Sequence, residues 1–153
     1  MQNYKDIAPI KVGDQAPEFT LKNQAGEKIA LNDFLNKQNI LLIFYPGDST
    51  PGCTTQLCAI RDDFSKFQNQ NITVFGINPA DEGSHQKFID KNQFAFDLLI
   101  DDDKEVSKKY QATKLFFGKP IINRTVVLIN KAGKIIFLKK GTPSDAEILA
   151  TLK

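Results

Sequence analysis

The sequence predicts an α/β fold in which a central sheet is flanked by helices. Three observations support this class: apolar runs of strand length that end in turn residues, amphipathic helical patterns between those runs, and a length of 153 residues. A domain of this size buries about 68–70% of the surface that its unfolded chain exposes, so a core is feasible without disulfides or a structural metal. No internal repeat and no Gly/Ser-rich linker divides the chain. We therefore expect one domain over residues 1–153.

Six short apolar segments are the predicted strands. In chain order they are residues 19–21, 29–31, 40–45, 72–77, 124–129 and 134–138. The first two flank a turn and predict a small N-terminal hairpin. Residues 40–45 and 72–77 are nearly continuous hydrophobic runs, which is typical of central strands covered on both faces. The last two segments are joined by a short turn that contains Gly133, so they predict an antiparallel hairpin.

Four further segments have helical patterns. They are residues 57–67, 84–91, 103–110 and 144–152. The first has Leu57, Ile60, Phe64 and Phe67 at three- and four-residue spacing with charged residues between them, which makes one apolar stripe on a solvated helix. Pro143 stands just before the last segment, where it suits a helix start. Strands that alternate with helices and finish in a hairpin and a helix predict a layered α/β architecture.

Composition excludes several functional classes. Twenty Lys and Arg against 18 Asp and Glu leave a net charge of +2 with no block of like charges, so we expect no nucleic-acid partner. Two cysteines and one histidine cannot fill a closed zinc site without carboxylates, and they are far too few for a disulfide-dense secreted scaffold. The longest apolar run is residues 40–45, far below the roughly 20 residues of a membrane span. Residues 1–11 contain no signal-peptide core, so we expect a protein of the reducing cytoplasm without a membrane partner.

The two cysteines follow the end of a predicted strand. Residues 45–58 read YPGDSTPGCTTQLC, which places Cys53 near the start of the next helix. Ligands bind at the carboxyl ends of strands in open α/β sheets, and the unpaired amides and dipole of a helix N-terminus favour an anion there. A thiol in such a position forms the nucleophilic thiolate more readily. In a reducing compartment a close pair of cysteines is more often chemical than structural, so Cys53 is the candidate nucleophile.

The residues before Cys53 could form the rim of a substrate pocket. The hydroxyl of Thr50 can donate and accept hydrogen bonds at this mouth. Pro46 and Pro51 stiffen the loop and remove two backbone donors, so we take Pro46, Pro51 and Gly52 as candidate substrate-binding residues. Taken alone, Thr50, Pro51 and Gly52 are better explained as a turn that starts a helix.

Cys58 limits how the two thiols can react with each other. In one regular helix their Cα atoms lie about 8.7 Å apart and ~140° around the axis. A disulfide tolerates at most about 7 Å, so the thiols can pair only if the first turns of the helix unwind. This predicts a folded reduced state and a locally unfolded oxidised state. The alternative for Cys58 is a structural role as a small buried hydrophobe.

The pattern Pro46-x-x-x-Thr50-x-x-Cys53 resembles the active-site motif of the peroxiredoxins. The longer run from Phe44 to Cys58 is similar to the peroxiredoxin Q, or bacterioferritin comigratory protein, branch. Individually weak matches extend over most of the chain, namely GDxAPxFxL at 13–21, SHxxF at 84–88, LLID at 98–101 and the strand that opens with RT at 124–125. The sequence departs from the branch at Gly47, Gln56 and Asn78-Pro79, where a lysine, a glutamate and a Ser-containing loop are common.

The resemblance implies a thioredoxin-like fold with a central mixed sheet and a thiol-dependent peroxidase without cofactor or metal. Cys53 would attack the O–O bond of hydrogen peroxide or an organic hydroperoxide and become a sulfenic acid. Cys58 would resolve it as an intramolecular disulfide, which thioredoxin or a similar dithiol would reduce. Thr50 would hydrogen-bond the peroxide or thiolate, and Arg124 would be the cation beside the sulfur, although without the resemblance it reads as a surface charge at a strand start. The branch also suggests a monomer.

Two other functions fit the same cysteines. A general thiol–disulfide oxidoreductase is one, but its usual spacing is Cys-x-x-Cys and four residues intervene here. A peroxide-sensing redox switch is the other. Outside the motif we interpret His85 as a solvated residue on an exposed helix, with no partner set for a metal. We interpret residues 101–103, Asp-Asp-Asp, as a helix N-cap and first turn rather than a cation site.

Overall fold

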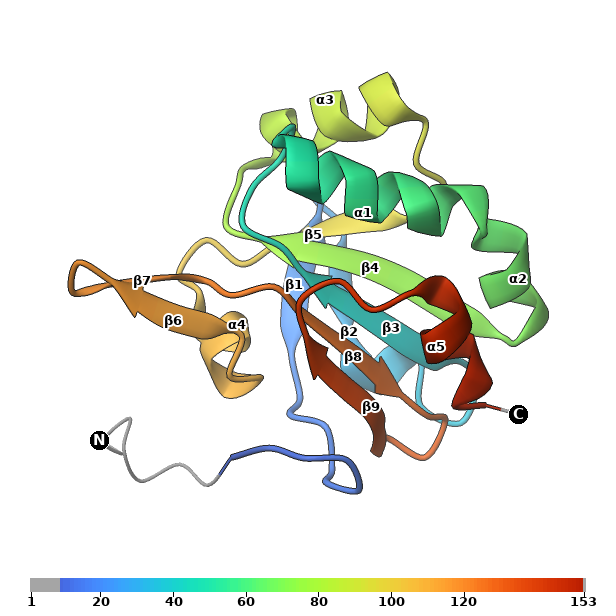
Figure 1. Cartoon of the computed structure of the whole chain (residues 1–153). Helices are drawn as coiled ribbons and strands as arrows, with labels where there is room; N and C mark the ends of the chain where they lie inside the picture. Colours follow the sequence, from blue (N-terminus) through green and yellow to red (C-terminus); the bar gives the residue numbers. More distant parts are fainter. Residues whose placement is uncertain (1–8, 153) are drawn as a thin grey trace.

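The computed structural model describes residues 9–152. Residues 1–8, on which much of the expectation about targeting rests, lie outside that range. Figure 1 shows the arrangement of the elements. In chain order they are β1 (Thr20–Asn23), β2 (Lys28–Ala30), the 3-10 helix η1 (Leu31–Asp33), β3 (Asn39–Phe44), α1 (Pro51–Asp62), α2 (Phe64–Asn69), β4 (Ile72–Asn78), α3 (Glu82–Asn92), β5 (Asp97–Ile100), α4 (Glu105–Lys109), β6 (Thr113–Phe116), β7 (Lys119–Ile122), β8 (Thr125–Ile129), β9 (Ile135–Lys140) and α5 (Asp145–Ala150).

A seven-stranded mixed sheet organises the chain, with the strand order β2-β1-β5-β4-β3-β8-β9. The three central strands β5, β4 and β3 run parallel to one another. β8 is antiparallel to β3, β9 is antiparallel to β8, and β1 is antiparallel to both β2 and β5. The predicted central mixed sheet and its N-terminal and C-terminal hairpins are therefore confirmed.

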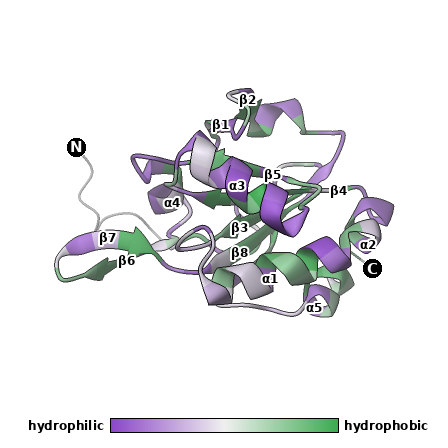
Figure 2. Cartoon of the chain, turned by 90° about the horizontal axis from the view of Figure 1, so that it is seen from above, coloured by the Kyte–Doolittle hydropathy of each residue, from purple (hydrophilic) through white to green (hydrophobic). Residues whose placement is uncertain are grey.

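Helices cover both faces of this sheet, which explains why its central strands are continuously apolar. All six residues of β3 and all five of β8 are buried. Leu41 and Ile43 of β3 face the core under α1, α2, α3 and α5. Ile40 and Leu42 point to the opposite core, which α4 and the segment before β1 help to close. Figure 2 shows hydrophobic residues along the central strands and hydrophilic residues on the outer turns of α3. No helix within residues 9–152 has both the length and the apolarity to cross a membrane.

Three elements differ from the predictions. The single helix predicted over residues 57–67 is two helices, because the chain breaks between α1 and α2 at Asp63. β5 was not among the predicted strands. The β6–β7 hairpin was also missed. Its turn holds Phe117 and Gly118 at φ of 50° and 78°, and it lacks the Asn-Gly or Asp-Gly pair that usually marks such a turn.

The acidic run that follows β5 is not the helix N-cap and first turn that was predicted, because the N-cap of α4 is Lys104; Asp101 nevertheless binds the start of that helix from several residues earlier in the chain. The buried carboxylate of Asp101 accepts hydrogen bonds from the backbone amides of Val106 and Ser107 in the first turn of α4, and from the Ser107 hydroxyl. The helix itself begins at Glu105 rather than at residue 103. Within residues 9–152 no three His, Cys, Asp or Glu side chains are grouped so that they could hold a metal ion.

Candidate active site

Cys53 is the third residue of α1, just beyond the carboxyl end of β3. Thr50 has an extended backbone and precedes the helix, and Pro51 occupies its first position. The backbone amide of Thr54 donates to the carbonyl of Thr50 at 2.9 Å. The amides of Gly52 and Cys53 come before this bond, so they point out of the N-terminal end of the helix. Two backbone donors and the positive end of the helix dipole therefore lie beside the Cys53 thiol.

The Cys53 side chain lies directly beneath an exposed rim. Cys53 itself is 0% exposed and belongs to the core on the α1 face of the sheet, together with Tyr45. Thr50, Pro51 and Gly52 are all exposed. The core therefore holds the thiol in place, and the three residues that precede it in the chain are exposed.

Arg124 reaches the first turn of α1 because of the strand pairing. It stands one residue before β8, and Thr125 of β8 pairs with Phe44 at the end of β3. A methyl group placed on Gly52 would lie only 2.7 Å from Nη2 of Arg124, so the guanidinium lies against the backbone next to Cys53. Arg124 is thus half-buried against α1, and it is not a surface charge at a strand start.

Gln56 holds the guanidinium in this position. It is a buried residue one turn further along α1, and its Oε1 accepts a hydrogen bond of 3.2 Å from Nη1 of Arg124. An amide oxygen orients the guanidinium without neutralising it. The positive charge of Arg124 therefore stays available to an anion at Cys53.

The start of α1 is built from residues that form helices poorly. Gly, Cys and Thr at positions 52–55 all rank low in helix propensity. The hydroxyls of Thr54 and Thr55 donate to the carbonyls of Thr50 and Pro51, at 2.7 and 3.0 Å. The Thr50 hydroxyl does not cap the helix and instead donates to the carbonyl of Gly47 at 3.2 Å. Such local side-chain bonds compete with regular helical structure.

Cys58 lies in the same helix and faces α3. It is half-buried, and its Sγ lies 3.7 Å from Oδ1 of Asn92, the last residue of α3. Nη1 of Arg61 donates to the Asn92 carbonyl at 2.7 Å, so this end of α1 is fastened to α3. Both cysteines are free thiols. Because both lie in α1, the helical geometry keeps them too far apart for a disulfide.

The interpretation of His85 as a solvated residue is wrong. Its side chain is 0% exposed and lies on the face of α3 that also buries Phe88. Nδ1 lies 2.7 Å from Oδ2 of Asp48, and Nε2 lies 3.0 Å from the carbonyl oxygen of Leu99 in β5. Both ring nitrogens face oxygen atoms, so the ring links the Asp48 carboxylate to the backbone of β5. The apolar residues at 88 and 89, three and four positions further on, were the signal that could have placed His85 on the buried face.

Asp48 joins the loop before α1 to three other elements. Its Oδ1 accepts from the Tyr45 hydroxyl at 2.6 Å and from the Asn78 side-chain amide at 3.0 Å. Its Oδ2 accepts from the Ser84 hydroxyl at 2.7 Å and from His85. Four donors fill the lone-pair positions of one carboxylate whose side chain is 4% exposed. Neither Asp48 nor these contacts were singled out from the sequence, because the four donors come from distant parts of the chain.

The charges in this group depend on one another. Burial acts to raise the pKa of Asp48, but the hydrogen bonds from His85, Tyr45 and Ser84 outweigh it, and the net shift is downward. Burial, with the Asp48 charge as the next cause, raises the pKa of Tyr45 well above its usual value. The Cys53 sulfur contributes to the same upward shift of the pKa of Tyr45. Tyr45 is therefore a neutral hydroxyl that donates to Asp48, with its ring beside the thiol.

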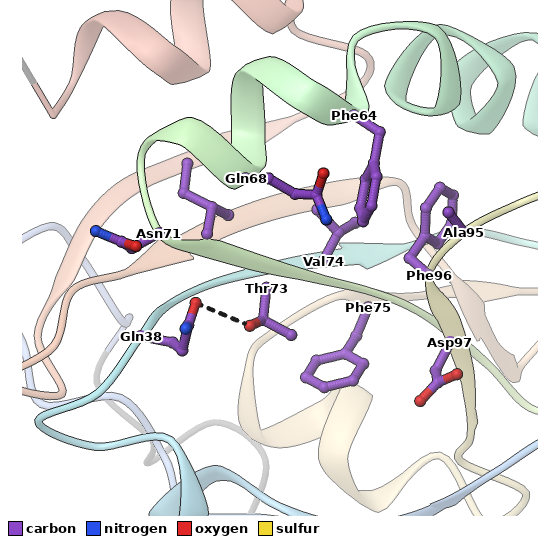
Figure 3. A pocket seen from close by; sticks show the side chains of 11 residues that line it. Gln38, Phe64, Gln68, Asn71, Thr73, Val74, Phe75, Ala95, Phe96 and Asp97 are labelled. Atoms are coloured by element: carbon purple, nitrogen blue, oxygen red, sulfur yellow. Dashed lines mark hydrogen bonds between the residues drawn. The ribbon is translucent and has the colours of Figure 1, made fainter.

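A cavity of about 380 Å³ lies at the other end of the sheet (Figure 3). The start of β4, α2 and the segment that leads into β5 line it. In this cavity the Thr73 hydroxyl donates to Oε1 of Gln38 at 3.3 Å. None of the residues that line it is a cysteine, a histidine, a lysine or an arginine. The cavity therefore offers no thiol, no imidazole and no cation, and it lies away from the Cys53 thiol.

Fold and site together define a class of protein: a thiol-based redox enzyme with a thioredoxin-like fold. Residues 12–138 match the AhpC/TSA family, and the chain belongs to that family. The resemblance to the peroxiredoxins is thereby confirmed.

Two solved structures and one relative illustrate the similarity. The chain is 38% identical over 151 residues to peroxiredoxin Bcp of Bacillus subtilis, which covers 94% of this chain and 96% of the relative. The structure of peroxidoxin BcpB from Mycobacterium tuberculosis superposes with a TM-score of 0.86 at 30% identity, covering 94% of this chain and 96% of the other. A structure of the bacterioferritin comigratory protein of Xanthomonas campestris, from work on its alkyl peroxide reduction activity, superposes with a TM-score of 0.79 at 25% identity, covering 88% and 89%.

Proposed function

We propose that this protein is a thiol-dependent peroxidase that reduces hydrogen peroxide and organic hydroperoxides through Cys53. The observation that carries the proposal is the juxtaposition of Cys53 at the start of α1 with Arg124 against the same turn. Membership of the AhpC/TSA family supports it. So does the alkyl peroxide reduction activity of the structurally similar Xanthomonas campestris protein.

In the first step the Cys53 thiolate attacks one oxygen of the peroxide. A sulfur–oxygen bond forms, the O–O bond breaks, and the leaving oxygen takes up a proton and departs as water or an alcohol. Sulfur loses two electrons and the peroxide gains them. Negative charge moves from sulfur to the leaving oxygen during the attack. The Arg124 guanidinium, with its five donors, can follow that charge, as can the amide donors at the start of α1.

In the second step Cys58 resolves the Cys53 sulfenic acid. The Cys58 sulfur displaces hydroxide from Cys53, a disulfide forms, and one water leaves with the Cys58 proton. The helical geometry of α1 requires its first turns to unwind before this step. We propose Thr50 as a hydrogen-bonding partner of the peroxide, and Pro46, Pro51 and Gly52 as the walls of its pocket, since the last two are exposed and immediately precede the buried Cys53 in the chain.

Reduction of the disulfide closes the cycle. We propose thioredoxin or a similar dithiol protein as the reductant, because unwinding of α1 would bring the disulfide to the surface. We further propose a single-domain monomer that acts in the reducing cytoplasm. The net charge of +2 without blocks of like charge supports the absence of a nucleic-acid partner, and we propose no membrane partner.

Intact-protein mass spectrometry after one equivalent of peroxide tests the mechanism. The expected product has lost two hydrogens and contains an internal Cys53–Cys58 crosslink, and peroxide is consumed catalytically when a dithiol is supplied. Cys53→Ser should abolish consumption. Cys58→Ser should accumulate sulfenic acid, over-oxidise and recycle poorly with thioredoxin.

The alternatives give different results in the same assays. Rapid reduction of a protein disulfide without peroxide turnover would identify a general thiol–disulfide oxidoreductase. Oxidation by one equivalent of peroxide without turnover would identify a redox switch. Either result would replace the peroxidase assignment.

A further inference from the structure

The two steps of the proposed cycle place opposite demands on the start of α1. Attack on peroxide needs the first turn folded, because the free amides and the position of Gly52 against Arg124 exist only in that conformation. Disulfide formation needs the same turn unwound. The ratio of folded to unwound α1 therefore sets how fast each step runs.

Local interactions do little to keep this turn folded. Gly52, Thr54 and Thr55 are poor helix formers. The hydroxyls of both threonines donate to carbonyls of the first turn, and such bonds compete with the backbone hydrogen bonds of the helix. Thr50 provides no side-chain cap. The folded state must therefore depend on tertiary contacts, which are the burial of Cys53, the packing of Arg124 against the turn, and the contacts of the chain immediately before the helix.

Asp48 supplies the contacts of the chain before the helix. It lies two residues before Thr50, and its carboxylate is bound by Tyr45, Asn78, Ser84 and His85. The four donors stand at the ends of β3 and β4 and in the first turns of α3, elements fixed by the sheet. We define Asp48 with these four donors as the Asp48 latch. Figure 1 shows the starts of α1 and α3 at the same end of the molecule.

We propose that the Asp48 latch holds the loop before α1, and with it the first turn of the helix, in the conformation that reacts with peroxide. The inference rests on the proposed function. Asp48 and His85 are positioning residues that touch neither sulfur nor peroxide. His85 connects Asp48 to the sheet, because its Nε2 lies 3.0 Å from the carbonyl oxygen of Leu99 in β5.

The opposite end of α1 is held independently. Arg61 donates to the carbonyl of Asn92, and Cys58 faces the side chain of the same residue. Release of the latch would therefore unwind the start of α1 while Cys58 keeps its place beside α3. Weakening the latch should slow attack on peroxide and should speed, or leave unchanged, the formation of the disulfide.

Asp48→Ala and Ser84→Ala are the variants that weaken the latch. Asp48→Ala leaves four donors without their acceptor. Ser84→Ala removes one of the four bonds and puts a good helix former into α3, so its fold is secure. Asp48→Asn is the conservative rescue: its side-chain oxygen can accept from two donors, and its side-chain amide can donate to the Ser84 hydroxyl oxygen. Tyr110→Phe is the matched control, because it loses a buried hydrogen bond of 2.6 Å to the carbonyl of Pro17, on the other face of the sheet.

The readout is rapid mixing with peroxide followed by acid quench and mass spectrometry, which suits a chain without Trp. It separates the rate of sulfenic acid formation from the rate of disulfide formation. We expect attack to fall about tenfold or more in Asp48→Ala and roughly two- to threefold in Ser84→Ala, with disulfide formation at or above the wild-type rate. Asp48→Asn should recover most of the attack rate, and Tyr110→Phe should change neither rate.

Wild-type rates of attack in both Asp48→Ala and Ser84→Ala would overturn the latch. So would a fall of both rates by the same factor, since that is the signature of a general loss of active protein. If the wild type itself never loses two hydrogens on treatment with peroxide, the proposed function fails. If it does so and the variants keep its ratio of rates, only the latch fails.

Discussion

Gly52 offers the sharpest test of the role of Arg124, because Gly52→Ala alters no reactive group. The added methyl would lie 2.7 Å from Nη2 and 3.5 Å from Cζ of Arg124. Ordinary contact begins at roughly 3.5 Å, so the end of the guanidinium must retreat by about 0.8 Å. The obstructing atom is the tip of a flexible side chain, and Gly52 is not in the left-handed region. The fold should therefore survive.

The displacement is large enough to measure. A misplacement of about 1 Å in a catalytic group can cost about a hundredfold in rate, so we expect attack on peroxide to slow by roughly 10- to 100-fold. Alanine in place of glycine also stabilises a helix by about 0.5–1 kcal/mol, which corresponds to roughly two- to fivefold in the unwinding equilibrium. Gly52→Ala should therefore slow disulfide formation as well, by that smaller factor.

Rapid-quench mass spectrometry measures the rates of attack and of disulfide formation, and thermal unfolding tests whether the variant is folded. Gly47→Ala is the control within the same loop, because its methyl would meet only Cγ2 of Thr50, at an ordinary 3.5 Å. We expect the control to react within about twofold of the wild type. A Gly52→Ala protein that is folded and attacks peroxide at the wild-type rate would show that the position of Arg124 does not affect the attack. Arg124 would then not belong to the active site.

Three further outcomes follow from the packing and the charges. Gly76→Ala would place a methyl 2.7 and 3.0 Å from two buried side chains over β4, so urea unfolding should show a loss of about 1–3 kcal/mol, and an unchanged midpoint would contradict the packing. Burial, followed by the hydrogen bond and charge of Asp63, raises the pKa of Asp145 to about 7 from 3.8. Between about pH 4 and pH 7 the folded protein therefore keeps a proton on Asp145 that the unfolded chain loses, so the free energy of unfolding should decline as the pH rises. Thermal unfolding at pH 5 and pH 7 should show a smaller decline for Asp145→Asn than for the wild type. Gln56→Glu would place a carboxylate against the Arg124 guanidinium, where it would compete with the Cys53 sulfur for the positive charge. Steady-state peroxidase assays should then show kcat/KM lower by roughly three- to tenfold. A kcat/KM equal to that of the wild type would argue that the charge of Arg124 does not act on Cys53.

Much of the fold could be predicted because its central strands are buried on both faces. Continuous apolar runs mark β3 and β4, and a glycine turn marks the β8–β9 hairpin, so local sequence carried the signal. The β6–β7 hairpin gave no such signal. It forms a separate two-stranded sheet, and the bulky Phe117 is an unusual residue at positive φ. The division of α1 from α2 also lay beyond periodicity, since the apolar stripe continues across the break.

The candidate site was only partly predictable, for a different reason. Cys53, Thr50 and Cys58 lie in one contiguous segment, and the end of one predicted strand followed by an apolar helical stripe places Cys53 near a helix start. Arg124 comes from more than 60 positions further on, and only the antiparallel pairing of β8 with β3 brings it to α1. His85 was misread because a lone polar residue in a helix is usually solvated, whereas here a buried acceptor, Asp48, lies opposite it.

The spacing of the two cysteines explains why the start of α1 has low intrinsic helix stability and depends on tertiary contacts. Five positions in a helix put the thiols on different faces, so a rigid helix could protect a reactive Cys53 but could never join it to Cys58. A helix start of strong helix formers with a good cap would favour attack and block resolution. Poor helix formers without tertiary contacts would favour formation of the disulfide and slow attack on peroxide. Stability placed in long-range contacts to Asp48 and Arg124 can be released by movement of one loop. The same contacts that prepare Cys53 for peroxide can thus be lost together once the sulfur has been oxidised.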